Sequence, residues 1–131
     1  MCLNKLENFH YEPKGKCWKV VFFRRNREQG LLVGWNSLFY HCDDMQFNKW
    51  IWCRDHKIRT DKPNEYYNSG FHVFIDKKEA QAYCGPHENV VECEYDEVIT
   101  SGIQVFDNQP LRCLVVKKIF VKQPEENPNV S

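Results

Sequence analysis

Cysteine and histidine occur twice in this chain at a spacing typical of zinc ligands. The pairs are Cys53/His56 and Cys84/His87, each separated by two residues. Structural zinc takes four nitrogen or sulfur ligands, which two such pairs could supply. Seven cysteines and five histidines also produce this spacing by chance. Free thiols packed as small apolar side chains are therefore the simpler interpretation, and no cofactor is expected.

A second chemical possibility lies at Cys2. Removal of Met1 would leave its thiol beside an amine able to act as a base, as in N-terminal nucleophile enzymes. An inert thiol is the alternative. We therefore treat Cys2 as an alternative catalytic residue.

Two carboxylates form a third candidate. Glu92 and Glu94 alternate with apolar residues in "VVECEY", so both should project from one face of a strand. With Arg24 or Arg25 nearby they could form an active site. The competing interpretation is a solvated strand face, which alternating glutamates usually indicate.

The main candidate site is a run of aromatic and basic residues. Aromatic residues make up 15% of the chain, including four tryptophans, and each buried indole N–H needs a partner. Aromatic faces beside cationic groups suit a nucleotide or a protein hot spot. The predicted binding residues are Trp35, Lys49, Trp50, Trp52, Arg54, Arg59, Tyr66, Tyr67 and His72.

The overall composition narrows the class of protein. Eighteen basic and eighteen acidic residues cancel, which argues against general nucleic-acid binding. No signal peptide or membrane-spanning run is recognisable, and the many cysteines then suggest a reducing, cytoplasmic location. An exposed aromatic surface would make a homodimer possible.

These residues must be positioned by short strands and one clear helix. Strands are predicted at 17–24, 31–42, 70–75, 90–95 and 112–121. In "GFHVFI" (70–75), Phe71, Val73 and Ile75 should share one face of the strand, and His72 and Phe74 the other. Asp76 should cap a helix that ends at Gly85 and Pro86, with Glu79 completing a capping box. Residues 43–57 are predicted as a short helix or irregular turn running into a strand. Residues 59–69 should form a loop, and residues 96–110 a further short strand with turns.

The predicted fold class is α+β, a bent and mostly antiparallel sheet carrying one or two short helices. Residues 1–121 should form a single domain. Residues 122–131 are polar, contain two prolines and should form a disordered tail.

Two resemblances extend this interpretation. The "MC" start, the strand "CWKVV", the segment "GFHVF" with its following "DKKEA" helix, and "VVECEY" together resemble small uncharacterised bacteriophage proteins. This likeness implies an accessory protein acting in the host cytoplasm. Such a protein would bind a host or defence protein, or sequester a small nucleotide, as an anti-defence factor.

The segment "GFHVFIDKKEAQAYC" is also similar to the "GIYFA…SANYC" segment of ADP-ribosyltransferases. This second likeness implies a split-sheet fold as the runner-up topology. It also implies an enzyme or pseudoenzyme that binds NAD, with Tyr83 at the nicotinamide and Glu92 or Glu94 as the acid. The binding function is the leading hypothesis, and enzymatic activity is the alternative.

Overall fold

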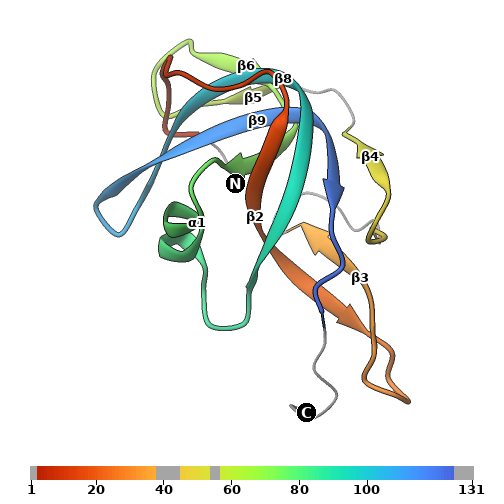
Figure 1. Ribbon diagram of the computed structural model, residues 1–131. Helices are drawn as coiled ribbons and strands as arrows, with labels where there is room; N and C mark the ends of the chain where they lie inside the picture. The colour runs from red at the N-terminus through yellow and green to blue at the C-terminus, as the bar shows by residue number, and fades with distance from the viewer. Residues whose placement is uncertain (1–2, 38–44, 54–56, 126–131) are drawn as a thin grey trace.

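The computed structural model describes residues 3–37, 45–53 and 57–125 (Figure 1). Strands dominate this part of the chain, and a single short helix lies between two of them. The elements are β1 (Lys5–Leu6), β2 (Gly15–Arg25), β3 (Leu32–Ser37), β4 (Trp50–Trp52), β5 (Lys57–Arg59), β6 (Tyr66–Asn68), β7 (Phe71–Phe74), α1 (Lys77–Tyr83), β8 (Asn89–Phe106) and β9 (Gln109–Val121).

Four of the strands close into a ring. Strand β8 pairs with β2, β2 with β7, β7 with β9, and β9 again with β8, all antiparallel. Strand β1 adds to β8, β3 to β2 and β4 to β9, while β5 and β6 form a separate two-stranded sheet. The closed ring makes the core of the protein a small barrel, and β4 lies on its margin.

The long hairpin of β8 and β9 supplies most of this ring. Its turn is Asp107–Asn108, whose φ angles of 51° and 61° belong to the left-handed region that two-residue hairpins require. Strand β8 also carries a register shift between Val98 and Thr100, beside Glu97 with a φ of 57°. This irregularity bends β8, so that it can pair with β2 at one end and with β9 along the rest.

Two apolar clusters pack on the strands. The first includes Trp35, Phe71 and Val73, together with Cys93 and Ile119. The second lies beneath α1 and the β5–β6 hairpin and includes Val20, Ile58, Tyr67, Phe74 and Tyr83. Alternate residues of β7 therefore belong to opposite clusters, as the alternation in "GFHVF" predicts.

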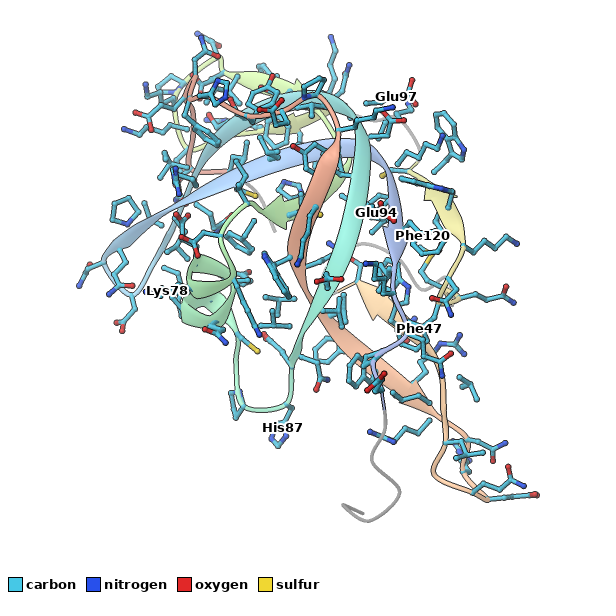
Figure 2. The ribbon with its side chains drawn as sticks, viewed as in Figure 1. Phe47, Lys78, His87, Glu94, Glu97 and Phe120 are labelled. Carbon is cyan, nitrogen blue, oxygen red and sulfur yellow. The ribbon has the colours of Figure 1, made fainter. Side chains whose placement is uncertain are left out.

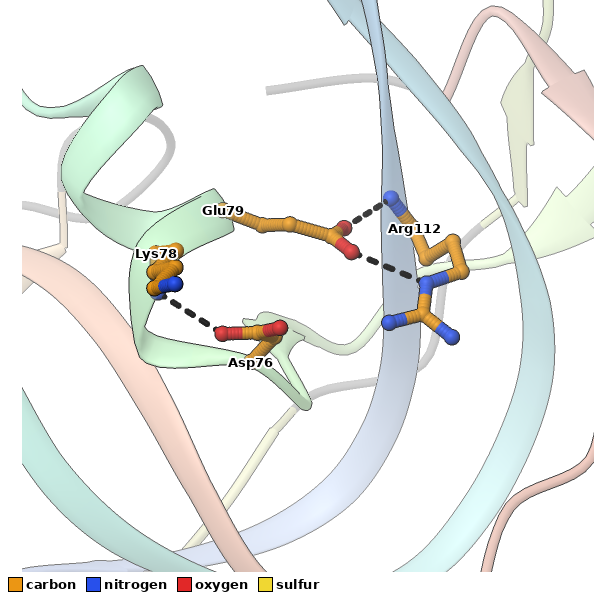
Figure 3. Close-up of polar contacts among 4 residues, drawn as sticks. All are labelled: Asp76, Lys78, Glu79 and Arg112. Atoms are coloured by element: carbon orange, nitrogen blue, oxygen red, sulfur yellow. Dashed lines mark hydrogen bonds and ion pairs between the residues drawn. The ribbon is translucent and has the colours of Figure 1, made fainter.

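Helix α1 begins as its capping residue predicts. The Asp76 side chain accepts a hydrogen bond from the Lys78 backbone N–H at 2.9 Å, and Cys84 caps the other end (Figure 3). Glu79 does not fold back onto the cap. It instead accepts hydrogen bonds from the Arg112 backbone N–H and from Arg112 Nε, the latter at 2.9 Å. Glu79 therefore ties the helix to β9.

The predicted α+β class is wrong. Strands account for 57% of the structure and helix for 6%, so the fold is nearly all β. The reason is that stretches rich in turn-forming residues continue as strands, and α1 is the one helix among the described residues. The ADP-ribosyltransferase-like split sheet is set aside with it, because the strands of the core close on one another.

Several local predictions also differ from the structure. Residues 96–106 continue β8 instead of forming a separate short strand, and 66–68 form β6 instead of loop. Of the predicted tail, Lys122 contacts Glu92 and Gln123 contacts Asn48, whereas residues 126–131 lie outside the described part.

Candidate functional site

Two tryptophans are exposed on strand β4. Trp50 and Trp52 retain 40% and 55% of their accessible surface, whereas Ile51 between them packs against the first core cluster. This is the alternation of a strand at the margin of a sheet. In register with them on β9 lie Phe120, opposite Trp50, and Lys118, opposite Trp52.

A lysine lies between the two indoles. Lys118 Nζ is 5.0 Å from the centre of the Trp50 ring and 4.9 Å from that of Trp52. Both distances are within the range of a cation–π interaction. Phe120 packs against Trp50 with ring centres 5.7 Å apart. These contacts hold the two indoles in place while leaving much of each ring in water.

The two cross-strand pairs between β4 and β9 continue across the sheet onto β8. Glu94 is in register with Phe120, and Asp96 is in register with Lys118. Directly opposite residues in neighbouring strands share a face. Figure 2 shows Glu94 and Phe120 next to each other on β8 and β9. We call Trp50, Trp52, Lys118, Phe120, Glu94 and Asp96 the β4 surface.

Two hollows meet at Trp50. One, of about 370 Å³, is lined by Met45, Gln46, Lys49, Trp50, Ile51 and Trp52. The other, of about 430 Å³, is lined by Lys14, Gly15, Trp50, Glu94, Tyr95 and Asp96. Trp50 therefore separates a hollow beside β4 from a hollow over β8.

The structure divides the predicted binding residues among separate places. Lys49, Trp50 and Trp52 stay together at the β4 surface. Arg59 and Tyr66 face each other on the exposed side of the β5–β6 hairpin. Arg54 lies outside the described residues.

The remaining three predicted binding residues are buried. Trp35 packs in the first cluster, and no described residue accepts a hydrogen bond from its indole N–H. Tyr67 and His72 pack near the second cluster. These three therefore do not belong to the same surface as Trp50 and Trp52.

Tyr67 and His72 form a buried hydrogen-bonded pair. The Leu3 backbone N–H donates to the Tyr67 hydroxyl at 2.9 Å, and this hydroxyl lies 3.0 Å from His72 Nε2. Burial, and secondarily the charge of Lys19, lowers the pKa of His72 to about 3. The ring is therefore neutral at physiological pH, and Nε2 accepts the hydroxyl proton of Tyr67.

Lys19 is a buried cation that the sequence analysis did not identify. It is only 2% exposed, and its Nζ donates to the His72 carbonyl oxygen at 3.1 Å. Burial lowers the pKa of Lys19, and the nearby thiols of Cys93 and Cys113 partly oppose this. Burial also raises the pKa of Cys113, to about 12, so this thiol is protonated and unreactive. The sequence signal for its burial is the alternation on β2, which places Lys19 on the same face as the apolar residues Cys17 and Val21.

Two of the four alternative catalytic residues, Tyr83 and Glu92, occupy structural positions. Tyr83 is buried between Phe74 and Phe106, with ring centres 5.7 and 5.1 Å away. Glu92 binds Lys122 at 2.8 Å and Lys16 at 2.6 Å, and these bonds lower its pKa to about 2. Glu92 is thus a carboxylate engaged with two lysines. Glu94 is exposed on the β4 surface, and Cys2 lies outside the described residues.

The alternative metal ligands are dispersed. Cys53 packs in the first cluster, whereas Cys84 packs against the second. His87 projects from the loop after α1 (Figure 2), and His56 lies outside the described residues. Within residues 3–37, 45–53 and 57–125, no three histidine, cysteine or acidic side chains are grouped so that they could hold a metal.

Three residues of the β4 surface, Asp96, Lys118 and Phe120, were missed from the sequence. Lys118 and Phe120 lie in "VVKKIFV", which was interpreted only as the last strand. Their alternation with Ile119 and Val121 indicates a strand with one exposed face, and that signal would have marked them.

Over the described ranges, no helix is both long and apolar enough to cross a membrane. Comparison of the chain with protein-family models, curated proteins and solved structures found no match. The function must therefore be argued from the geometry of the β4 surface.

Proposed function

We propose that this protein acts by binding a protein partner through the β4 surface. The observation that carries the proposal is the exposure of Trp50 and Trp52 around the ammonium of Lys118. Leaving an indole ring in water is unfavourable in free energy, and tryptophan is among the residues that contribute most to binding at protein interfaces. Because Lys118 and Phe120 already order both rings, little side-chain entropy remains to be lost on binding.

The charges around the hollows favour a protein over a small nucleotide. The hollow over β8 is lined by Glu94 and Asp96 against one basic residue, Lys14. Two carboxylates at this place would repel a phosphate group. A mixed rim of acidic and basic side chains around exposed aromatic rings is instead the composition of a protein interface.

The likeness to bacteriophage accessory proteins gives this proposal a biological direction. On that reading the partner is a host or defence protein, and binding takes place in the host cytoplasm.

The experiment compares two variants by affinity purification from the source cells followed by mass spectrometry. Trp50→Ala with Trp52→Ala should remove a partner that the unchanged protein retains. Tyr66→Ala is the matched control, because Tyr66 is also exposed at 53% but lies on the separate β5–β6 hairpin.

Thermal unfolding of all three proteins must first show that they are equally folded. A partner set that is the same for the double variant, the control and the unchanged protein would refute the proposal. Loss of the same partner from the Tyr66→Ala control would also refute it, because the effect would then not be specific to β4.

A further inference from the structure

The outer edge of β4 carries backbone groups that face away from the sheet. The Cys53 N–H donates to the Lys117 carbonyl at 2.8 Å, so these two residues form a hydrogen-bonded pair between β4 and β9. In an antiparallel ladder, hydrogen-bonded pairs alternate with pairs whose backbone groups point away from each other. Ile51 therefore bonds to β9, whereas the N–H and C=O groups of Trp50 and Trp52 point outward. No described strand pairs with that edge.

A hollow runs along the same edge. Every residue that lines the 370 Å³ hollow belongs to β4 or to the segment just before it, and none comes from β9. The hollow therefore lies on the side of β4 that faces away from the sheet. It places outward backbone groups, the edge of two indoles and the side chains of Met45 and Ile51 along one path.

The hollow beside β4 carries charge of one sign. Among the residues that line it, Lys49 alone is charged, and Lys49 is exposed. On the indole face, the ammonium of Lys118 is instead balanced by Asp96, which lies opposite it on β8. A strand laid along the hollow would therefore meet the positive charge of Lys49.

We propose that the partner adds an extended segment with acidic side chains to the outer edge of β4, with which no described strand pairs. The inference rests on the proposed function and names the form of the partner. Backbone hydrogen bonds to Trp50 and Trp52 would supply affinity, and carboxylates near Lys49 would supply selectivity. An apolar side chain next to a carboxylate would enter the hollow against Met45 and Ile51.

Fluorescence anisotropy with short labelled peptides tests this directly. The probe alternates glutamate and valine and is capped at both ends. A second peptide has lysine in place of glutamate, and a third is the acidic peptide with every backbone nitrogen methylated. We expect the acidic peptide to bind and the other two to bind at least about tenfold more weakly, because they lose charge pairing or backbone hydrogen bonds.

Variants of the protein locate the site. Lys49→Glu should weaken binding of the acidic peptide at least about fivefold, whereas Lys62→Glu, on the β5–β6 hairpin, should leave it unchanged. Equal binding of the acidic and lysine peptides, binding of the methylated peptide, or equal effects of the two variants would each overturn the inference. A homodimer that buries β4, detected by light scattering, would overturn it as well.

The outcome is separable from that of the proposed function. If no acidic peptide binds but Trp50→Ala with Trp52→Ala still removes a partner, the β4 surface binds in another way. If the peptide binds and no partner depends on the tryptophans, the edge is a binding site without the proposed role.

Discussion

His72 and Lys19 are basic side chains that this fold keeps away from water. Each is almost fully buried, and Lys19 donates to the backbone carbonyl of His72. Burial disfavours the charged form of both, and their proximity disfavours two positive charges together. The pKa of each is lowered accordingly, to about 3 for His72. The interior therefore has a built-in sensitivity to acid.

We predict that His72 makes the protein less stable below pH 6.5. In the unfolded chain its pKa is 6.5, and in the fold it is about 3. The unfolded state therefore binds more protons in this window, and stability is lost as the pH falls from 6.5 towards 3. The expected loss is about 1.4 kcal/mol per pH unit. Denaturant unfolding at several pH values measures it.

His72→Gln should flatten this acid slope, because glutamine does not titrate and can still accept from the Tyr67 hydroxyl. His87→Gln is the control, because His87 is exposed in the loop after α1. An acid slope that is unchanged in His72→Gln would show that other groups cause it.

Residue identity alone did not separate the buried tryptophan from the exposed ones. Trp35 and Trp50 have the same side chain, yet one is fully enclosed and the other is 40% exposed. The difference comes from the face of the strand: Trp35 points into the first cluster, whereas on β4 it is Ile51 that points there and Trp50 lies on the opposite face. An aromatic excess predicted that some rings would be exposed, but the face of each strand decided which.

At the scale of elements, α1 depends on a tether to β9. The helix has seven residues, too few to be stable in water on its own. Its Asp76 cap satisfies one end, and Glu79 joins it to Arg112. Ala80 and Tyr83 bury the other face. The helix therefore owes its position to packing and to one bidentate contact.

We predict that Glu79→Ala destabilises the protein by about 1 kcal/mol, because the backbone N–H and the guanidinium of Arg112 both lose the carboxylate that accepts from them. Lys78→Ala should cost less than about 0.5 kcal/mol, since its side chain is exposed and only its backbone N–H is used. Urea unfolding of both variants checks this. Equal losses would show that Glu79 is not a tether.

The sequence predicted some of the elements well for local reasons. The Asp76 cap and the alternation in "GFHVF" act within a few residues, and both are confirmed by the structure. Strand β8 was instead divided in two, because "DEVITSG" contains the residues of a turn. Its continuity depends on the ladder with β9, which is formed by residues farther along the chain. The pair Asp107–Asn108 was an overlooked hairpin signal.

Across the whole molecule, the ring is uneven in strength. The β8–β9 ladder extends from Cys93–Val121 to Phe106–Gln109, whereas β2 and β7 meet at a single pair, Trp18–Phe74. Trp18 also lies beneath the ammonium groups of Lys16 and Lys77. The seam between β2 and β7 is thus held mainly by side chains. No local pattern predicts such a closure, because it joins segments far apart in sequence.

We predict that amide hydrogen exchange follows this unevenness. The amides of β8 and β9 that pair with each other should be the slowest to exchange. Those of β4 and of the β5–β6 hairpin should exchange at least about tenfold faster, because these short strands lie outside the ring. Uniform protection measured by mass spectrometry or NMR would contradict this picture.

The order of the strands along the chain has a consequence for biosynthesis. Strand β2 can pair with β3 soon after both leave the ribosome, but β7 and the other edge of β2 are made before β8 and β9, their partners in the ring. During that interval, their apolar residues lack most of the sheet and remain open to chaperones or to neighbouring nascent chains. Closure of the ring therefore awaits translation of β9, and a ribosome stalled before β9 would release an aggregation-prone fragment.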